Sequence, residues 1–153
     1  MSLTFRAYQP GDFDTLYAID QVCYPPDIAY SKRTLRWFLN LPGAACVVAE
    51  TSGAAVGFIL AESDAGRGHI ITLDVLEHAR RRGFGTALLD TIEHTFAGRG
   101  VREVALETAT NNEAAVAFWN KHGYRTVGVL KRYYSGRLDA YSMQKLLRVR
   151  KET

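Results

Sequence analysis

Residues 80–89 read Arg-Arg-Arg-Gly-Phe-Gly-Thr-Ala-Leu-Leu, and the fold follows from this stretch. An expected strand at 69–76 comes directly before it. After it, apolar side chains recur at helical spacing as far as Phe96. The N-terminus of such a helix offers unpaired N–H groups and the positive end of the helix dipole, here beside three arginines. The stretch therefore predicts a phosphate-binding loop.

Gly83 and Gly85 suit such a loop, because a Cβ atom would keep the backbone away from phosphate oxygens and would restrict the turn angles. Taken alone, a surface turn with scattered arginines explains the stretch equally well. Other phosphate loops are excluded by spacing, since the chain has no G-x-x-x-x-G-K-[ST] and no G-x-G-x-x-G followed by an acidic residue about twenty positions on. Nucleoside triphosphatases and dinucleotide oxidoreductases are therefore excluded.

The remaining sequence supplies the elements around this loop. Period-two and period-3.6 patterns of apolar residues distinguish strands from helices. We expect strands near residues 3–8, 45–51, 55–62, 69–76, 101–108, 124–130 and 140–147, and helices at 12–23, after residue 31, at 83–96 and at 112–121. This order predicts an α/β (α+β) fold with one mixed sheet of about seven strands and helices on both faces.

Length and composition indicate one globular domain over residues 1–153 with a short basic tail at about 148–153. The chain is 47% hydrophobic and 23% charged, which is typical of a protein that folds alone and not of a disordered chain. Cys23 and Cys46 lie far apart, without the spacing of a zinc or redox site, so we expect no metal.

The net charge of +3 is modest, and basic residues gather only at 80–82 and in the tail. A nucleic-acid binder usually shows a broader basic stripe, so we expect no nucleic-acid partner. No targeting signal and no apolar run of about 18 residues occurs, so we expect no membrane partner and a cytoplasmic protein. We expect a monomer or a weak dimer.

A second motif, N-x-x-A-x-x-F-W-x-x-x-G-Y, occupies residues 112–124. With R-x-x-G-x-G at 80–85 and the order of elements, it resembles the GNAT superfamily of N-acetyltransferases along essentially the whole chain. The resemblance implies acetyl-CoA as cofactor, with its pantetheine arm along 73–75 and its pyrophosphate on 80–86. The implied cofactor-binding residues are Leu73, Asp74, Val75, Arg80, Arg81, Arg82, Gly83, Phe84, Gly85, Thr86, Asn112, Ala115, Phe118 and Trp119.

The segments 131–134 (Lys-Arg-Tyr-Tyr) and 139–143 (Asp-Ala-Tyr-Ser-Met) are similar to the ending of N-terminal acetyltransferases, including the ribosomal-protein-alanine type. This narrower resemblance implies that the acceptor is the N-terminal α-amine of a protein, such as a ribosomal protein. The loop at Tyr24 and Pro25 lies where those enzymes place a turn that grips the substrate. The implied acceptor-binding residues are Tyr24, Pro25, Tyr30, Tyr133 and Tyr134.

Acetyl transfer to an amine needs a base, because only the neutral amine is a nucleophile. Glu107 ends an otherwise apolar strand and aligns with the catalytic glutamate of ribosomal-protein acetyltransferases, so we expect it to be the base. His69 begins the neighbouring expected strand and can complete a relay through water. Tyr133 is a third catalytic candidate, and Asp74, which faces the opposite side of its strand from Leu73 and Val75, ranks below these.

Trp119 departs from the family pattern, because many relatives carry a tyrosine there that is proposed to protonate the departing thiolate. An indole N–H donates a hydrogen bond but is no acid at neutral pH. Tyr133, Tyr134 or water can supply the proton, or the thiolate can leave unassisted. Three alternative functions also stay open: acetylation of a small-molecule amine, a catalytically silent coenzyme A-binding module, and a basic nucleic-acid-binding domain.

Overall fold

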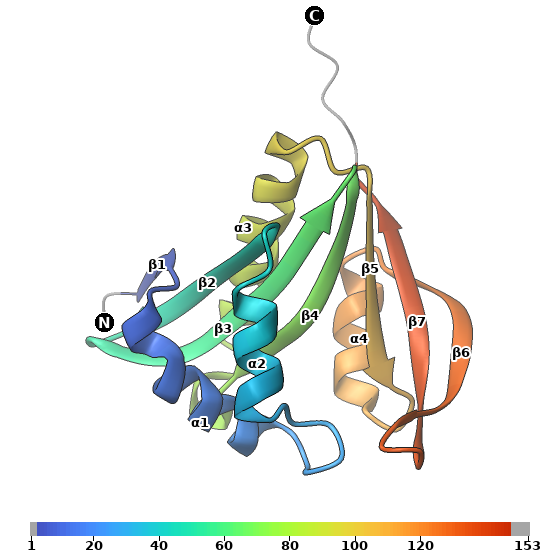
Figure 1. Cartoon of the computed structure of the whole chain (residues 1–153), viewed down its shortest axis with the longest axis horizontal. Helices are drawn as coiled ribbons and strands as arrows, with labels where there is room; N and C mark the ends of the chain where they lie inside the picture. Colours follow the sequence, from blue (N-terminus) through green and yellow to red (C-terminus); the bar gives the residue numbers. More distant parts are fainter. Residues whose placement is uncertain (1–2, 148–153) are drawn as a thin grey trace, which may run out of the picture.

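The strands of residues 3–147, which the computed structural model describes, form one mixed sheet in the order β1-β2-β3-β4-β5-β7-β6 (Figure 1). The strands are β1 (Leu3–Ala7), β2 (Ala44–Thr51), β3 (Ala54–Asp64), β4 (Arg67–Val75), β5 (Glu103–Ala109), β6 (Arg125–Tyr134) and β7 (Leu138–Leu146). The helices are α1 (Phe13–Cys23), α2 (Lys32–Leu39), α3 (Phe84–Gly98) and α4 (Glu113–Lys121), and short 3-10 turns lie at Pro10–Asp12 and Glu77–Ala79. The predicted order of elements is confirmed.

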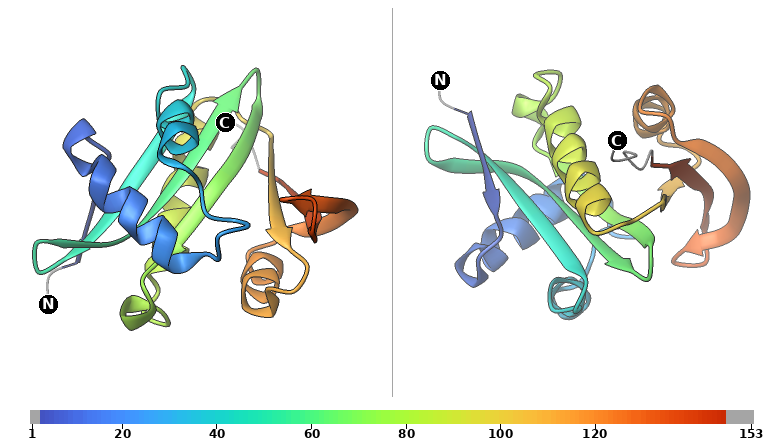
Figure 2. Two further views of the ribbon diagram at one scale, coloured as in Figure 1. Left: turned by 60° about the horizontal axis from the view of Figure 1, so that its bottom comes forward. Right: turned by 90° about the horizontal axis from the view of Figure 1, so that it is seen from above.

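Helices cover both faces of the sheet, with α1 and α2 on one face and α3 and α4 on the other (Figure 2). On the α3 face, Leu88 and Ile92 belong to a fully buried apolar cluster with strand residues such as Ile59. On the opposite face, Leu16 and Leu35 pack in a second cluster around β2 and β3. The predicted mixed sheet with helices on both faces is confirmed, and the two cores hold both sides of the β4 strand in place.

The sheet is split between its two middle strands, β4 and β5 (Figure 1). These parallel strands pair only where Arg67–His69 lies beside Glu103–Ala105, and they diverge beyond that point. Each keeps its antiparallel neighbour, because β3 follows β4 as far as Val75 and β7 follows β5 as far as Ala109. Both halves of the sheet thus stay ordered while the gap between them widens.

The edge of β4 that faces this gap is set by the alternation of backbone groups along a strand. Leu76 N donates to the Val56 carbonyl oxygen at 2.8 Å, so this residue points toward β3. The N–H and C=O groups of Leu73 and Val75 therefore point the other way, into the gap. The register with β3 shifts at Ile71, an extra residue whose bulge bends β4 near the start of the gap.

The close packing of α3 on β4 depends on Gly68. A Cβ atom on Gly68 would lie 2.6 Å from Cε2 and 2.7 Å from Cδ2 of Phe96, whose ring is completely buried and has no room to move away. We expect Gly68→Ala to lower the free energy of unfolding by about 1–3 kcal/mol through overpacking. Gly98→Ala in α3 is the control, because its Cβ would meet no atom within 4 Å. Thermal unfolding of the two variants measures the difference, and equal stabilities would contradict this packing.

The β6–β7 hairpin is longer than the sequence predicts. We expected strands at 124–130 and 140–147, yet β6 runs to Tyr134 and β7 starts at Leu138. Arg132 has a φ of 53°, which makes the strand irregular at this point. The Asp139 carboxylate accepts hydrogen bonds from the Arg132 N–H at 2.9 Å and from Lys131 Nζ at 3.3 Å. These bonds across the irregularity explain why pairing continues to the tyrosines.

Two further expectations concern the basic tail and a membrane partner. The basic tail at about 148–153 lies outside the described residues. Within residues 3–147, no helix is both long enough and apolar enough to cross a membrane.

Candidate active site

The gap between β4 and β5 opens into a cleft of about 680 Å³, a usual size for a ligand pocket. Its walls come from the α1–α2 loop, β4, the N-terminus of α3, β5, α4 and the end of β6. The structure gathers most of the residues that the sequence assigns to a site. Those that line the cleft are Tyr24, Tyr30, Leu73, Val75, Arg80, Arg81, Gly83, Phe84, Gly85, Thr86, Glu107, Asn112, Ala115, Phe118, Trp119 and Tyr134.

The loop at 80–86 forms one end of the cleft and has the features of an anion site. Gly83 precedes α3 with a left-handed φ of 82°, and no side chain caps the helix there. The first N–H groups of α3 therefore remain available to donate hydrogen bonds to a ligand. A Cβ on Gly83 would meet no atom within 4 Å, so the space beside it is open. Arg80 Nε donates to the Val75 carbonyl oxygen at 2.8 Å, which ties the loop to β4.

The backbone of β4 lines the middle of the cleft, and side chains occupy its carbonyl oxygens. The Leu73 oxygen accepts from Tyr24 Oη at 2.7 Å. The Val75 oxygen accepts from Arg80 Nε and, at 3.5 Å, from Cys23 Sγ. The N–H groups of Leu73 and Val75 point into the same space, so this strand edge offers donors to the carbonyl oxygens of a ligand lying along it.

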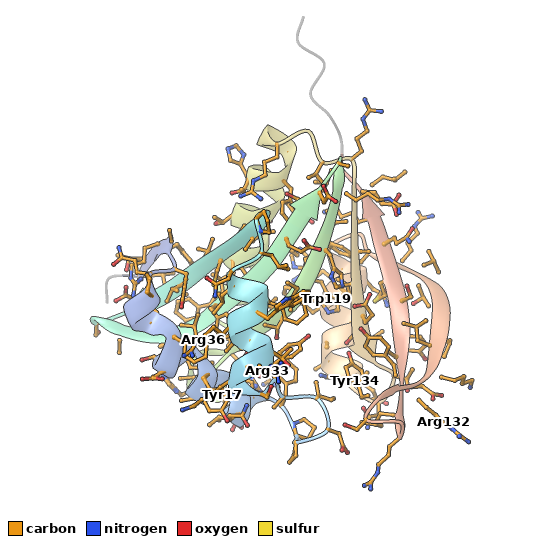
Figure 3. The ribbon with its side chains drawn as sticks, in the orientation of Figure 1. Tyr17, Arg33, Arg36, Trp119, Arg132 and Tyr134 are labelled. Carbon is orange, nitrogen blue, oxygen red and sulfur yellow. The ribbon has the colours of Figure 1, made fainter. Side chains whose placement is uncertain are left out.

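Helix α4 forms the wall opposite β4. Asn112 begins this helix, and its Oδ1 accepts from Ala115 N at 3.1 Å, so its side-chain NH₂ group is the part left to meet a ligand. Trp119 is 6% exposed and packs edge-on against Phe118 and Tyr124 at ring distances of 5.0 and 5.3 Å. This aromatic packing fixes the indole in the wall, where Figure 3 labels it.

Glu107 and His69 meet where β4 and β5 begin to diverge. His69 Nε2 lies 2.7 Å from Glu107 Oε1, and Tyr133 Oη donates to the same oxygen at 3.4 Å. Burial lowers the pKa of His69, but its hydrogen bond to Glu107 and the charges of Glu107 and Glu62 outweigh that effect and raise the pKa above 6.5. Glu107 is therefore in contact with both of the other catalytic candidates.

Tyrosines form the wide mouth of the cleft. Tyr24 and Tyr30 enter from the α1–α2 loop. Tyr134, which is labelled in Figure 3, enters from the end of β6. The two walls touch, because Ser135 Oγ donates to the Asp27 carbonyl oxygen at 3.2 Å. The α1–α2 loop and the segment after β6 thus bound the mouth of the cleft and contact each other. Glu107 lines the same cleft.

Some assigned residues lie elsewhere. Arg82 and Pro25 are exposed and do not line the cleft. The Asp74 side chain is buried on the α1 face, opposite the Leu73 side chain, and its backbone pairs with β3, so Asp74 does not line the cleft. Tyr133 reaches Glu107 from outside the cleft lining.

Two residues of interest were missed in the sequence. Lys121 lines the cleft from the last turn of α4 and adds a cation to the wall. Lys121 follows Phe118 by three residues, so both lie on one face of α4, and this spacing could have identified Lys121 from the sequence. Asp20 is completely buried. It lies four positions after Leu16, so an acidic residue on the apolar face of α1 could have pointed to it in the sequence.

A split mixed sheet, with an anion loop and an exposed strand edge in its cleft, suits an elongated ligand that carries phosphate groups. The chain belongs to the Acetyltransferase (GNAT) family, whose model matches residues 13–124. It is 35% identical to an N-alpha-acetyltransferase of Sulfurisphaera tokodaii over 86% of each chain. It is 32% identical to an uncharacterized N-acetyltransferase of Methanocaldococcus jannaschii over 94% of this chain and 91% of that one.

The fold also matches a solved structure, the ribosomal-protein-S18-alanine N-acetyltransferase from Escherichia coli. The TM-score is 0.88 at 22% identity, and the match covers 99% of this chain and 98% of that chain. At this identity the likeness concerns the fold. Family and fold together establish the protein as an N-acetyltransferase that uses acetyl-CoA.

The cleft fits this cofactor on its own geometry. The uncapped start of α3 and the cations of Arg80, Arg81 and Lys121 suit phosphates, and the open space beside Gly83 admits them. The N–H groups of the β4 edge suit the amide carbonyls of the pantetheine arm.

Proposed function

We propose that this enzyme acetylates the N-terminal α-amine of proteins. The observation that carries the proposal is the mouth of the cleft, where Tyr24, Tyr30 and Tyr134 line the walls and the hydrogen bond from Ser135 to Asp27 joins the two sides. An extended chain end fits such a passage, and phenol hydroxyls can bond its backbone. Homologues named N-alpha-acetyltransferase support this acceptor class.

Glu107 is the base in this proposal. Acetyl-CoA supplies the acetyl group as a thioester, and the protein must provide a neutral amine beside it. Glu107 removes the proton of the incoming ammonium, directly or through water, and its contact with His69 gives that proton a path onward. His69 also lines a smaller polar cavity of about 290 Å³, from which water can reach the imidazole. Tyr133 holds the Glu107 carboxylate in place.

We propose further that the thiolate leaves without a dedicated acid. Trp119 has no acidic proton at neutral pH. Burial, together with the nearby Tyr133 and Glu107, raises the pKa of Tyr134 well above its usual value, and burial with Glu107 raises that of Tyr133. A phenol that holds its proton so tightly donates a hydrogen bond but is poorly matched to proton transfer at neutral pH.

The proposed relay predicts a pH profile. His69 must be neutral to take a proton from Glu107, so kcat/KM should rise with pH through the pKa of His69, which lies above 6.5. His69→Gln should remove this limb of the profile and lower kcat about tenfold to about a hundredfold. The measurement is kcat/KM against pH for both proteins, and an unchanged limb in the variant would exclude His69 from the relay.

The acceptor class is tested with a panel of peptides and small amines assayed with acetyl-CoA. We expect turnover on peptides with a free N-terminal α-amine and none on the same peptides with a blocked N-terminus. Activity on polyamines, amino acids or antibiotics with none on peptides would replace the proposal with a small-molecule acetyltransferase.

A ribosomal protein is the acceptor we propose first, on the fold likeness to an enzyme named for one and on the tyrosine pair in β6. The first residue of the acceptor is tested by varying it in the peptide panel through alanine, serine and methionine. This acceptor favours a cytoplasmic location, where new N-termini emerge during synthesis. We propose that the enzyme is a monomer or a weak dimer.

A further inference from the structure

Two aspartates face each other beneath the acceptor loop, outside the relay described above. Asp20 of α1 is 0% exposed and Asp74 of β4 is 1% exposed, and their carboxyl groups are within hydrogen-bonding reach. One oxygen of each has a defined donor: Asp20 Oδ2 accepts from Tyr30 N at 2.8 Å, and Asp74 Oδ1 accepts from the Thr72 hydroxyl. The other two, Asp20 Oδ1 and Asp74 Oδ2, have no partner among the described residues.

A single shared proton accounts for both unpartnered oxygens. Two buried carboxyl groups in contact resist the ionisation of both at neutral pH, because burial and mutual repulsion each oppose the second charge. One carboxyl group that donates to the other carboxylate satisfies both oxygens with one hydrogen bond. Burial and then Asp20 raise the pKa of Asp74 well above its usual value, against the smaller opposing effects of Thr72 and Arg80.

We propose that this Asp20–Asp74 hydrogen bond latches the acceptor loop, residues 24–30, onto β4 and so positions the tyrosine wall for the acceptor. The proposal rests on the proposed function of that wall. Asp20 fixes the end of the loop through Tyr30 N. Beside it, Tyr24 and Tyr30 donate through their hydroxyls to the carbonyl oxygens of Leu73 at 2.7 Å and Ile71 at 3.3 Å. Both aspartates are thus positioning residues.

The surroundings of the pair offer little to balance a second negative charge. The ionisable groups that act on the pair or are acted on by it are Cys23, Tyr24, Tyr30, Cys46 and Arg80. Burial raises the pKa of Cys23 to about 11 and raises those of Cys46 and both tyrosines further, so all four are neutral at physiological pH. Arg80 is the one cation of this set, and its Nε is bonded to the Val75 carbonyl oxygen.

The shared proton sets the sign of a stability change with pH. The folded protein holds a proton that the unfolded chain releases near the ordinary carboxyl pKa of about 4. The stabilisation is therefore fully present below that pH and is lost as pH rises toward the raised pKa of the folded pair. At high pH the second ionisation breaks the latch, and the acceptor loop loses its anchor.

Asp20→Asn tests this directly, because an amide can accept from Tyr30 N and donate to the Asp74 carboxylate without any extra proton. Relative to this variant, the wild-type Tm should fall by about 4 °C or more between about pH 5 and about pH 8. The measurement needs no acceptor, so it remains valid if the proposed function is wrong. Parallel curves of Tm against pH for the two proteins would show that no proton is shared and would overturn the proposal.

The positioning role is tested by kinetics with a short alanine-initiated peptide. Asp20→Ala should raise the KM for this peptide about tenfold, while the Kd for acetyl-CoA changes less than about twofold. Asp20→Asn should restore the wild-type KM and should keep it at high pH, where that of the wild type rises. An equal loss of acetyl-CoA and peptide binding in Asp20→Ala, or no rescue by Asn, would make the pair merely structural and refute the latch.

Discussion

Replacing Glu107 with Gln should lower kcat about 10²–10⁴-fold while acetyl-CoA binding stays within about twofold. The amide keeps the size and hydrogen-bonding reach of the side chain but cannot accept the proton of the ammonium. Glu107 lines the cleft from β5 and contacts His69 and Tyr133, so its replacement leaves the loop at 80–86 and its cofactor contacts in place. Single-turnover rates and acetyl-CoA titration separate the two quantities.

Glu103→Gln is the matched control for that experiment. Glu103 lies four residues earlier on the same face of β5, and its carboxylate lies 4.0 Å from the guanidinium of Arg67. Glu103 lines the smaller cavity beside His69 but not the main cleft, and glutamine keeps its size and polarity there. Turnover should stay within about twofold of wild type, because an ion pair with a largely exposed partner contributes little. A kcat for Glu107→Gln close to that of this control would exclude Glu107 as the base. Acetyl-CoA binding without turnover by the wild type on the whole amine panel would instead indicate a silent binding module.

The sequence predicted the parts of the fold that depend on local patterns. Apolar periodicity located every strand and α-helix of residues 3–147, and the glycines at 83 and 85 located the turn that opens α3. It could not predict where β4 and β5 separate. That point depends on the bulge at Ile71 and on how far each strand follows its other neighbour, which are properties of the assembled sheet. The extension of β6 through Arg132 has the same origin, because it depends on a distant carboxylate, that of Asp139.

In the candidate site, too, the sequence predicts local motifs but not contacts between distant elements. Residues within a contiguous motif, such as Arg80 to Thr86, carry their spacing in the sequence and can be assigned from it. Contacts between elements cannot, and the Asp20–Asp74 pair is the clearest case. The sequence assigned Asp74 to the cofactor site and gave Asp20 no role, and only the packing of α1 on β4 buries both and brings them together. A charged residue on the apolar face of a helix therefore indicates a buried polar partner on a neighbouring element.

Gly83→Val should weaken acetyl-CoA binding about 100-fold, or ~2.7 kcal/mol. The substitution places a branched side chain in the open space beside the uncapped N-terminus of α3, where phosphate oxygens must approach the backbone. It also imposes a left-handed φ of 82° on a residue with a Cβ, which costs about 1–2 kcal/mol of stability. Gly53→Val separates the two effects, because Gly53 has a φ of 78°, equally free surroundings and a place in the β2–β3 turn, outside the lining of the cleft. Both variants should lose the same stability in thermal unfolding, and only Gly83→Val should lose affinity in a titration with acetyl-CoA. If the two bound acetyl-CoA equally well, the loop at 80–86 would be a structural turn and the phosphates would have to lie elsewhere in the cleft.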